Sequence, residues 1–143
     1  MDASKLVVFG DSVNWGQGLL AAHKFSTLVS NGLAANGTNL TVEMLAHSGA
    51  TIGARGPATT TKIDGEVPGS YPTVMEQVAL YDDDPSDVAM IILNGGINDI
   101  DIRVILNPLT TEADLRHDIQ QFCHLDMVTL LTQVVAGFPV AKP

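Results

Sequence analysis

The sequence predicts an α/β protein built around a parallel sheet. Three apolar segments are short and nearly continuous, which is typical of strands buried on both faces. Helix-like segments separate them, and strands that alternate with helices indicate repeated β-α-β units. The chain has 143 residues, 45% of them apolar, which suits one domain with a core of its own.

The three predicted strands are the segments 6–9, 40–46 and 88–93. The first and third are apolar throughout, whereas Glu43 interrupts the second. In an open α/β sheet, ligands bind at the carboxyl ends of the strands. We therefore expect the functional residues directly after positions 9, 46 and 93.

Three helices are predicted around these strands. The first covers 25–35, where Asn36-Gly37 is a stop signal, and the second covers 73–81. The third begins at Thr111, a plausible N-cap with Asp114 three residues later, and runs to about residue 136 before Gly137. Its apolar stripe is formed by Leu115, Ile119 and Phe122.

Composition excludes several classes of protein. The net charge is −9, and the seven basic residues are scattered, which argues against nucleic acid and anionic membranes as partners. Cys123 is the only cysteine, so neither an intrachain disulfide nor a cysteine-based metal site is expected. No apolar run approaches the roughly 20 residues of a membrane span, and the N-terminus has no signal-peptide pattern. The default expectation is a cytoplasmic protein without cofactor or metal, with secretion as the alternative.

A small, polar, glycine-rich block follows each predicted strand. The first block is 10–18 (Gly-Asp-Ser-Val-Asn-Trp-Gly-Gln-Gly), the second is 47–53 (His-Ser-Gly-Ala-Thr-Ile-Gly) and the third is 94–99 (Asn-Gly-Gly-Ile-Asn-Asp). Ser12 lies at a strand-to-helix turn, where free N–H groups and the helix dipole favour negative charge. Taken alone, Asp11 and Ser12 are better explained as a helix N-cap pair.

Together and in this order, the blocks resemble those of the SGNH hydrolase superfamily, the GDSL-type lipases and esterases. The first resembles the family's Gly-Asp-Ser block, the second its oxyanion-hole glycine block and the third its Gly-x-Asn-Asp block. The resemblance extends over about 6–99. It implies a flavodoxin-like, three-layer α/β/α fold with sheet order 2-1-3-4-5, of which residues 1–143 would form a single domain incomplete at its C-terminus.

The resemblance also implies roles for individual residues. Ser12 would attack a carboxylic ester, of the kind that lipases, short-chain esterases and carbohydrate deacetylases cleave. The backbone N–H of Ser12, the backbone N–H of Gly49 and the side-chain amide of Asn98 would hold the oxyanion. Asp11 and Asp99 would support the loops by hydrogen bonds.

A serine nucleophile also needs a general base, which the family supplies from an Asp-x-x-His block beyond the last strand. Asp114-Leu-Arg-His117 has this spacing, but it lies in the first turns of a predicted helix, where Asp114 acts as a cap. We expect His117, His124 and His23 to be exposed. His47 is the first residue of the second block and is a candidate cleft residue, with a role as base the minor alternative. The base is therefore expected from outside this chain.

Other interpretations remain open. Without a base, the chain would be a non-catalytic, ligand-binding form of the same fold. A nucleotide-binding domain is disfavoured, because neither a Gly-x-Gly-x-x-Gly loop nor a P-loop is present. With no further strand, the segment Val88–Leu93 would be an exposed apolar edge that invites self-association or a C-terminal partner. The loop 54–72, with Arg55 as its one anion-binding candidate, is expected to shape specificity.

Overall fold

A computed structural model of the chain describes residues 4–54 and 73–139. Three parallel strands, β1 (Lys5–Phe9), β2 (Thr41–Met44) and β3 (Val88–Leu93), form one sheet in the order β2-β1-β3. Both the parallel direction and the central position of the first strand confirm the prediction. Residue 55, with most of the loop expected to shape specificity, lies outside the described residues.

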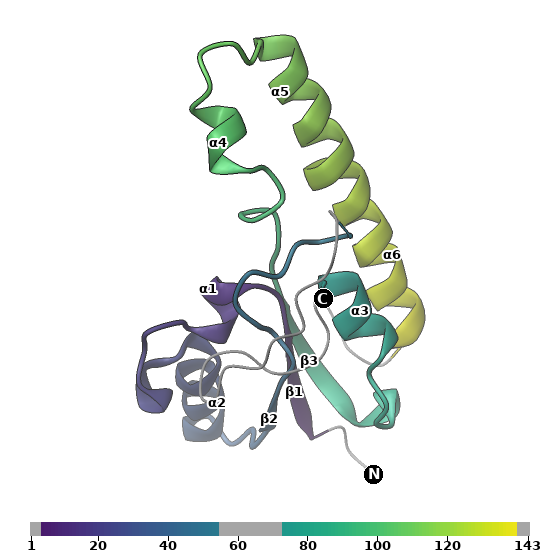
Figure 1. Cartoon of the computed structure of the whole chain (residues 1–143). Helices are drawn as coiled ribbons and strands as arrows, with labels where there is room; N and C mark the ends of the chain where they lie inside the picture. Colours follow the sequence, from purple (N-terminus) through teal and green to yellow (C-terminus); the bar gives the residue numbers. More distant parts are fainter. Residues whose placement is uncertain (1–3, 55–72, 140–143) are drawn as a thin grey trace.

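Helices connect and flank these strands (Figure 1). They are α1 (Ser12–Trp15), α2 (Phe25–Ala35), α3 (Val74–Ala79), α4 (Ile102–Ile105), α5 (Glu112–Asp118) and α6 (Asp126–Gly137). Two short 3-10 turns, Ala21–His23 and Pro85–Asp87, precede α2 and β3. A π-helical segment, Ile119–Leu125, joins α5 to α6.

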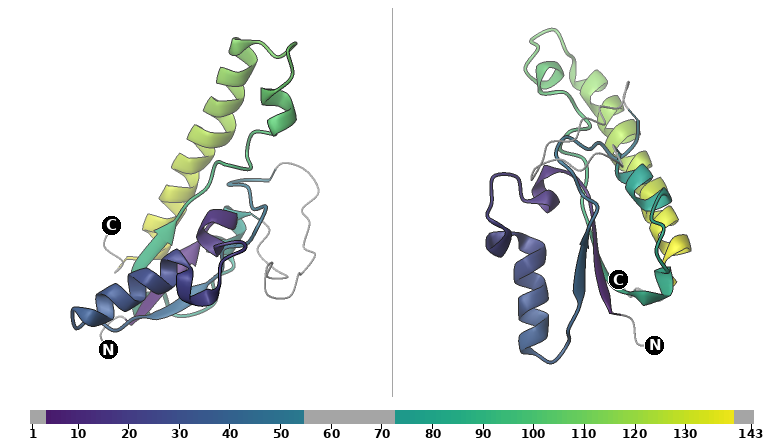
Figure 2. Two further views of the ribbon diagram at one scale, coloured as in Figure 1. Left: turned by 90° about the vertical axis from the view of Figure 1, so that its left-hand side faces the viewer. Right: turned by 60° about the horizontal axis from the view of Figure 1, so that its bottom comes forward.

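The sheet is the middle layer of three. Leu6 and Val8 pack on the face that α2 covers, whereas Val7 and Phe9 pack on the opposite face, against α3 and α6 (Figures 1 and 2). Side chains alternate between the two faces of a strand. Because all four are buried, β1 has apolar cores on both sides. This is the three-layer α/β/α architecture that the sequence predicts.

The second strand is shorter than predicted. It covers Thr41–Met44, not the whole of 40–46. Glu43 is accommodated because β2 is an edge strand of the described sheet, where its carboxylate lies 3.4 Å from the ammonium group of Lys5. After β2 the regular strand pairing ends, but the N–H groups of Leu45 and Ala46 still donate to the Val8 carbonyl at 2.9 and 3.0 Å, and Ala46 and His47 are buried.

The first and second predicted helices are confirmed. The helix α2 has the predicted bounds, and Gly37 follows its end at φ +88°. The helix α3 is a little shorter than 73–81, because Thr73 is its N-cap. The Thr73 hydroxyl accepts a bond from the Glu76 N–H at 3.1 Å, while the Glu76 carboxylate accepts from the Thr73 N–H. These two reciprocal hydrogen bonds form a capping box.

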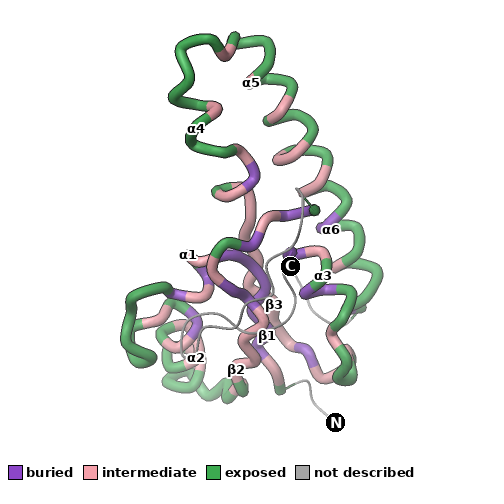
Figure 3. The backbone as a smooth tube through the Cα atoms, viewed as in Figure 1, coloured by how far each residue is buried: buried purple, intermediate pink, exposed green. Residues whose placement is uncertain are grey.

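The third predicted helix is continuous from α5 through the π-helical segment to α6, and Thr111 caps it with Asp114 as predicted. The predicted apolar stripe was wrong at Ile119, which is 50% exposed. Figures 1 and 2 show why: α4, which the sequence did not predict, and α5 project beyond the sheet. Figure 3 shows that most of this projecting part is exposed.

The outer edge of β3 is open in the described structure. Within 4–54 and 73–139, no strand pairs with β3 on the side away from β1. Val88 is buried, but the rest of the strand is only half-buried. No helix in these ranges is long and apolar enough to cross a membrane.

Candidate active site

The three blocks meet at the carboxyl edge of the sheet, because each comes after one of three neighbouring parallel strands: the first and third directly, the second after two further residues. At the first, Asp11 is the N-cap of α1, and its side chain accepts a hydrogen bond from the Val13 N–H at 2.9 Å. Ser12 is therefore the first residue of a short helix, which ends at Gly16 with φ +72°. The capping role of Asp11 is therefore compatible with a catalytic role for Ser12, because both would use the same turn.

Asn94 ties the third block to the first. Its Nδ2 donates to Asp11 Oδ1 at 2.7 Å, and its Oδ1 accepts from the Asp11 N–H at 3.1 Å. This pair requires glycine at position 10, because a Cβ there would lie 1.9 Å from Asn94 Oδ1. Gly10 also has φ +142°, a conformation that side chains disfavour.

Asn98 and Asp99 tie the third block to the second. Both carboxylate oxygens of Asp99, which is 5% exposed, accept from the Ile52 N–H at 3.0 and 3.1 Å. Asn98 Nδ2 donates to the Ala50 carbonyl at 2.9 Å. The second block in turn contacts the first, since the His47 N–H donates to the Gly10 carbonyl at 3.1 Å.

Gly49 forms the turn inside the second block. It is exposed, with φ +81°, and a Cβ added there would meet no atom within 4 Å. Its neighbour His47 is 4% exposed, and His47 Nδ1 lies 2.6 Å from the Ser48 carbonyl oxygen. Backbone conformation, not crowding, therefore requires a glycine here.

Gln77 of α3 belongs to the same network, although the sequence did not single it out. Its Oε1 accepts from the Gly10 N–H at 2.6 Å, and its Nε2 donates to the Gly10 carbonyl at 2.8 Å. A glutamine among the apolar residues of a short predicted helix was the available signal. Asn94 was likewise missed as a site residue, although it opens the third block.

Comparisons with known proteins bear on the fold of the chain. No protein-family model matches the sequence, and no curated protein matches it significantly. Among solved structures, AlinE4, described as an SGNH-hydrolase family esterase, matches at a TM-score of 0.50 and 18% identity over 93% of this chain. Two of its variants match at a TM-score of 0.52, with 19% and 18% identity.

The chain has the SGNH-hydrolase fold. The match covers 56% of the AlinE4 chain, so this chain spans little more than half the length of the esterases it resembles. The likeness concerns the backbone, since identity is below one residue in five.

Within this SGNH fold, Ser12 is half-buried and lines a shallow depression of about 460 Å³ together with Val13, Gly16, Gln17 and Leu19. Among the residues that the structure describes, no histidine forms a hydrogen bond with the Ser12 hydroxyl. His23, His117 and His124 are exposed, as predicted. Hydrogen bonds from Thr111 hold the pKa of Asp114 below its usual range, which fits the capping role.

Two buried polar atoms of the three blocks have no partner in the described structure. They are Asp11 Oδ2 and Ser48 Oγ, and the Tyr81 hydroxyl, which lies after the end of α3 and outside the blocks, is a third such atom. An unsatisfied buried group costs about 1–3 kcal/mol. Asp11 and Ser48, which directly precede Ser12 and Gly49 in the sequence, thus each have one buried oxygen without a hydrogen-bond partner.

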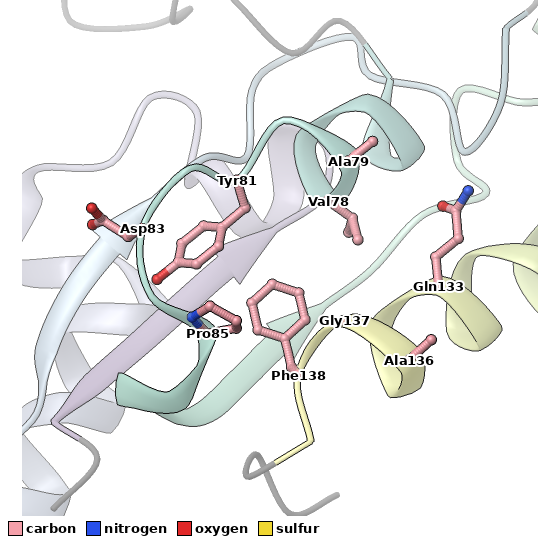
Figure 4. Close-up of a pocket in the computed structure, with 9 residues that line it drawn as sticks. All are labelled: Val78, Ala79, Tyr81, Asp83, Pro85, Gln133, Ala136, Gly137 and Phe138. Atoms are coloured by element: carbon pink, nitrogen blue, oxygen red, sulfur yellow. The ribbon is translucent and has the colours of Figure 1, made fainter. Parts of the chain in front are cut away.

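A second cavity, of about 440 Å³, lies away from these blocks, between α3 and the end of α6 (Figure 4). Tyr81, Pro85 and Phe138 face one another across it, while Gln133 and Ala136 approach from α6 (Figure 4). No residue of the three blocks lines it. The described residues contain no group of three or more His, Cys, Asp or Glu side chains that could hold a metal ion.

Proposed function

We propose that the chain supplies the nucleophile and the oxyanion-binding groups of a serine ester hydrolase that acts on carboxylic esters. The observation that carries this proposal is the hydrogen-bond network joining the turn of Ser12 to the blocks of Gly49 and Asn98. It supports the proposal because an oxyanion needs donors that are already oriented before the reaction begins.

Each group has a defined task in the proposed reaction. The Ser12 hydroxyl attacks the ester carbonyl, and negative charge develops on the carbonyl oxygen. The Ser12 N–H, at the start of α1, has no intrahelical partner and is one donor. The Gly49 N–H is the second. The side-chain amide of Asn98 is the third donor. One of its two N–H groups donates to the Ala50 carbonyl, and the other is left for the oxyanion.

The general base is the part of the proposal that the described residues do not supply. We propose that a histidine outside them takes the Ser12 proton. Without a base, oxyanion stabilisation and binding leave about 10³–10⁴-fold acceleration over water in related systems. The second candidate function, a ligand-binding module that does not turn over, is favoured by the observation that no described histidine hydrogen-bonds to Ser12.

Hydrolysis of p-nitrophenyl acetate and butyrate tests the proposal. The wild type is compared with Ser12→Ala and with Ser86→Ala, a control at an exposed serine remote from the blocks. Because the described residues supply no base, we expect the wild type to be slow, Ser12→Ala to be slower still and Ser86→Ala to match the wild type. Equal rates in all three would reject catalysis by this chain. Binding of an alkyl boronic acid, measured by calorimetry, would then test the ligand-binding alternative.

A further inference from the structure

The buried imidazole of His47 makes one short polar contact. Its Nδ1 lies 2.6 Å from the carbonyl oxygen of Ser48. A carbonyl oxygen can only accept a hydrogen bond, so Nδ1 must carry the proton. The backbone of His47 is also held by two hydrogen bonds. Its backbone N–H donates to the Gly10 carbonyl at 3.1 Å, and its backbone carbonyl accepts from the Ala50 N–H at 3.3 Å.

The acceptor of this bond belongs to the same peptide group as the Gly49 N–H. A trans peptide group is planar, and its C=O and N–H point in opposite directions. No cis peptide bond occurs in the described structure. Whatever holds the Ser48 carbonyl therefore also sets the direction of the Gly49 N–H.

This peptide group needs such a restraint. Its orientation depends on φ of Gly49, and glycine lacks the side chain that limits φ in other residues. Around Gly49 there is open space, since a Cβ would meet no atom within 4 Å. Packing therefore does not hold the peptide plane on the glycine side, whereas the His47 bond holds it on the carbonyl side.

We propose that His47 is a positioning residue that orients the Gly49 N–H towards the oxyanion, and that it is not the general base. This inference rests on the proposed ester hydrolysis. A hydrogen bond accepted by the carbonyl also polarises the peptide group and makes its N–H a stronger donor. His47 thus acts through Gly49, without touching the substrate.

Two substitutions separate positioning from base catalysis. His47→Asn keeps a donor, because Asn Nδ2 is bonded to Cγ as His Nδ1 is, but it removes the basic nitrogen. His47→Ala removes both. His117→Asn, at an exposed histidine on α5, is the matched control. If His47 positions Gly49, His47→Ala lowers kcat for p-nitrophenyl acetate by roughly 10–100-fold and changes KM little. This loss is smaller than the roughly 10²–10³-fold loss that follows removal of an oxyanion-hole donor itself. His47→Asn restores the rate to within a few-fold, and an Asn variant as inactive as the Ala variant would overturn the proposal.

A second measurement does not depend on turnover. The backbone amide resonance of Gly49 is recorded by ¹H–¹⁵N NMR in the wild type and both variants, with Gly37, another exposed glycine at positive φ, as the internal reference. The proposal expects the Gly49 resonance to shift in His47→Ala and to return in His47→Asn. An unchanged resonance in all three rejects the proposal. A shifted resonance without Ser12-dependent turnover supports the orienting bond and rejects the proposed hydrolysis.

Discussion

Gln77 pairs its side-chain amide with both polar backbone groups of Gly10, a residue 67 positions earlier, at 2.6 and 2.8 Å. Gln77 is fully buried. The pair fixes the last residue before the cap of α1, and with it the turn that presents Ser12. A helix on one face of the sheet thereby holds the loop at the carboxyl edge of the sheet.

Replacement of Gln77 tests this connection. Gln77→Leu leaves the N–H of Gly10 unpaired, whereas the Gly10 carbonyl keeps the bond from the His47 N–H at 3.1 Å. An unsatisfied buried group costs about 1–3 kcal/mol, and we expect the free energy of unfolding, measured in urea, to fall by that amount. Gln133→Leu, at an exposed position on α6, is the control and should have almost no effect.

Gln77→Glu adds a pH dependence. A buried carboxyl has a raised pKa, because burial disfavours its charged form. Since the folded pKa would exceed the unfolded value of about 4.3, stability is retained below that value and is lost as pH rises through the folded pKa. The protonated acid can still donate to the Gly10 carbonyl, whereas the carboxylate repels it. Unfolding in urea at pH 5 and pH 8 should show the variant closer to wild type at pH 5.

Gly10→Ala should be among the most damaging small substitutions in the chain. Its Cβ would lie 1.9 Å from Asn94 Oδ1, so the Asn94–Asp11 pair must move apart. Overpacking typically costs about 1–3 kcal/mol. Gly32→Ala, in the exposed interior of α2, meets no atom within 4 Å and should stabilise the protein by about 0.5–1 kcal/mol. Chemical denaturation of both variants checks the contrast, and equal effects would contradict it.

The capping box at Thr111 predicts a shift in an acid titration. Because bonds from Thr111 lower the pKa of Asp114, the Asp114 carboxylate stabilises the folded state above its unfolded pKa, and this contribution disappears as pH falls through the folded pKa. In Thr111→Ala, the Asp114 pKa, followed by NMR, should rise towards its ordinary value. Helix stability should drop by about 1 kcal/mol.

Unchanged hydrolysis in His117→Ala would confirm that this Asp-x-x-His sequence is structural.

The open edge of β3 predicts association. We propose that a second copy of this chain covers it in solution, because an unpaired apolar strand is a template for pairing. Light scattering coupled to size-exclusion chromatography should show a molar mass above that of one chain, rising with concentration. Leu109→Lys, in the exposed segment after α4, should leave this mass unchanged. A monomer at all concentrations would contradict the proposal.

The sequence predicted those features that depend on local pattern or on the order of the blocks. Continuous apolar runs located β1 and β3, and Asn36-Gly37 located the end of α2. Because parallel strands place their carboxyl ends together, the meeting of the three blocks also followed from their positions after strands.

What could not be predicted depends on partners distant in sequence. The Gln77–Gly10 pair joins residues in different layers, and no spacing rule connects them. Asn94 could be recognised as part of a block, but its pairing with Asp11 requires the register of β1 against β3. The exposure of Ile119 likewise depends on how far the last helix extends past the sheet, which its apolar periodicity does not reveal.

The projection of α4 and α5 beyond the sheet has a consequence for hydrogen exchange. No residue of α4, α5 or the π-helical segment is buried, whereas Leu130 of α6 is fully enclosed. Segments with few buried contacts open at a small fraction of the global unfolding free energy. The backbone amides of 102–118 should therefore exchange with deuterium long before those of β1, and the helix should fray from its Thr111 end towards Leu130 while the sheet stays intact.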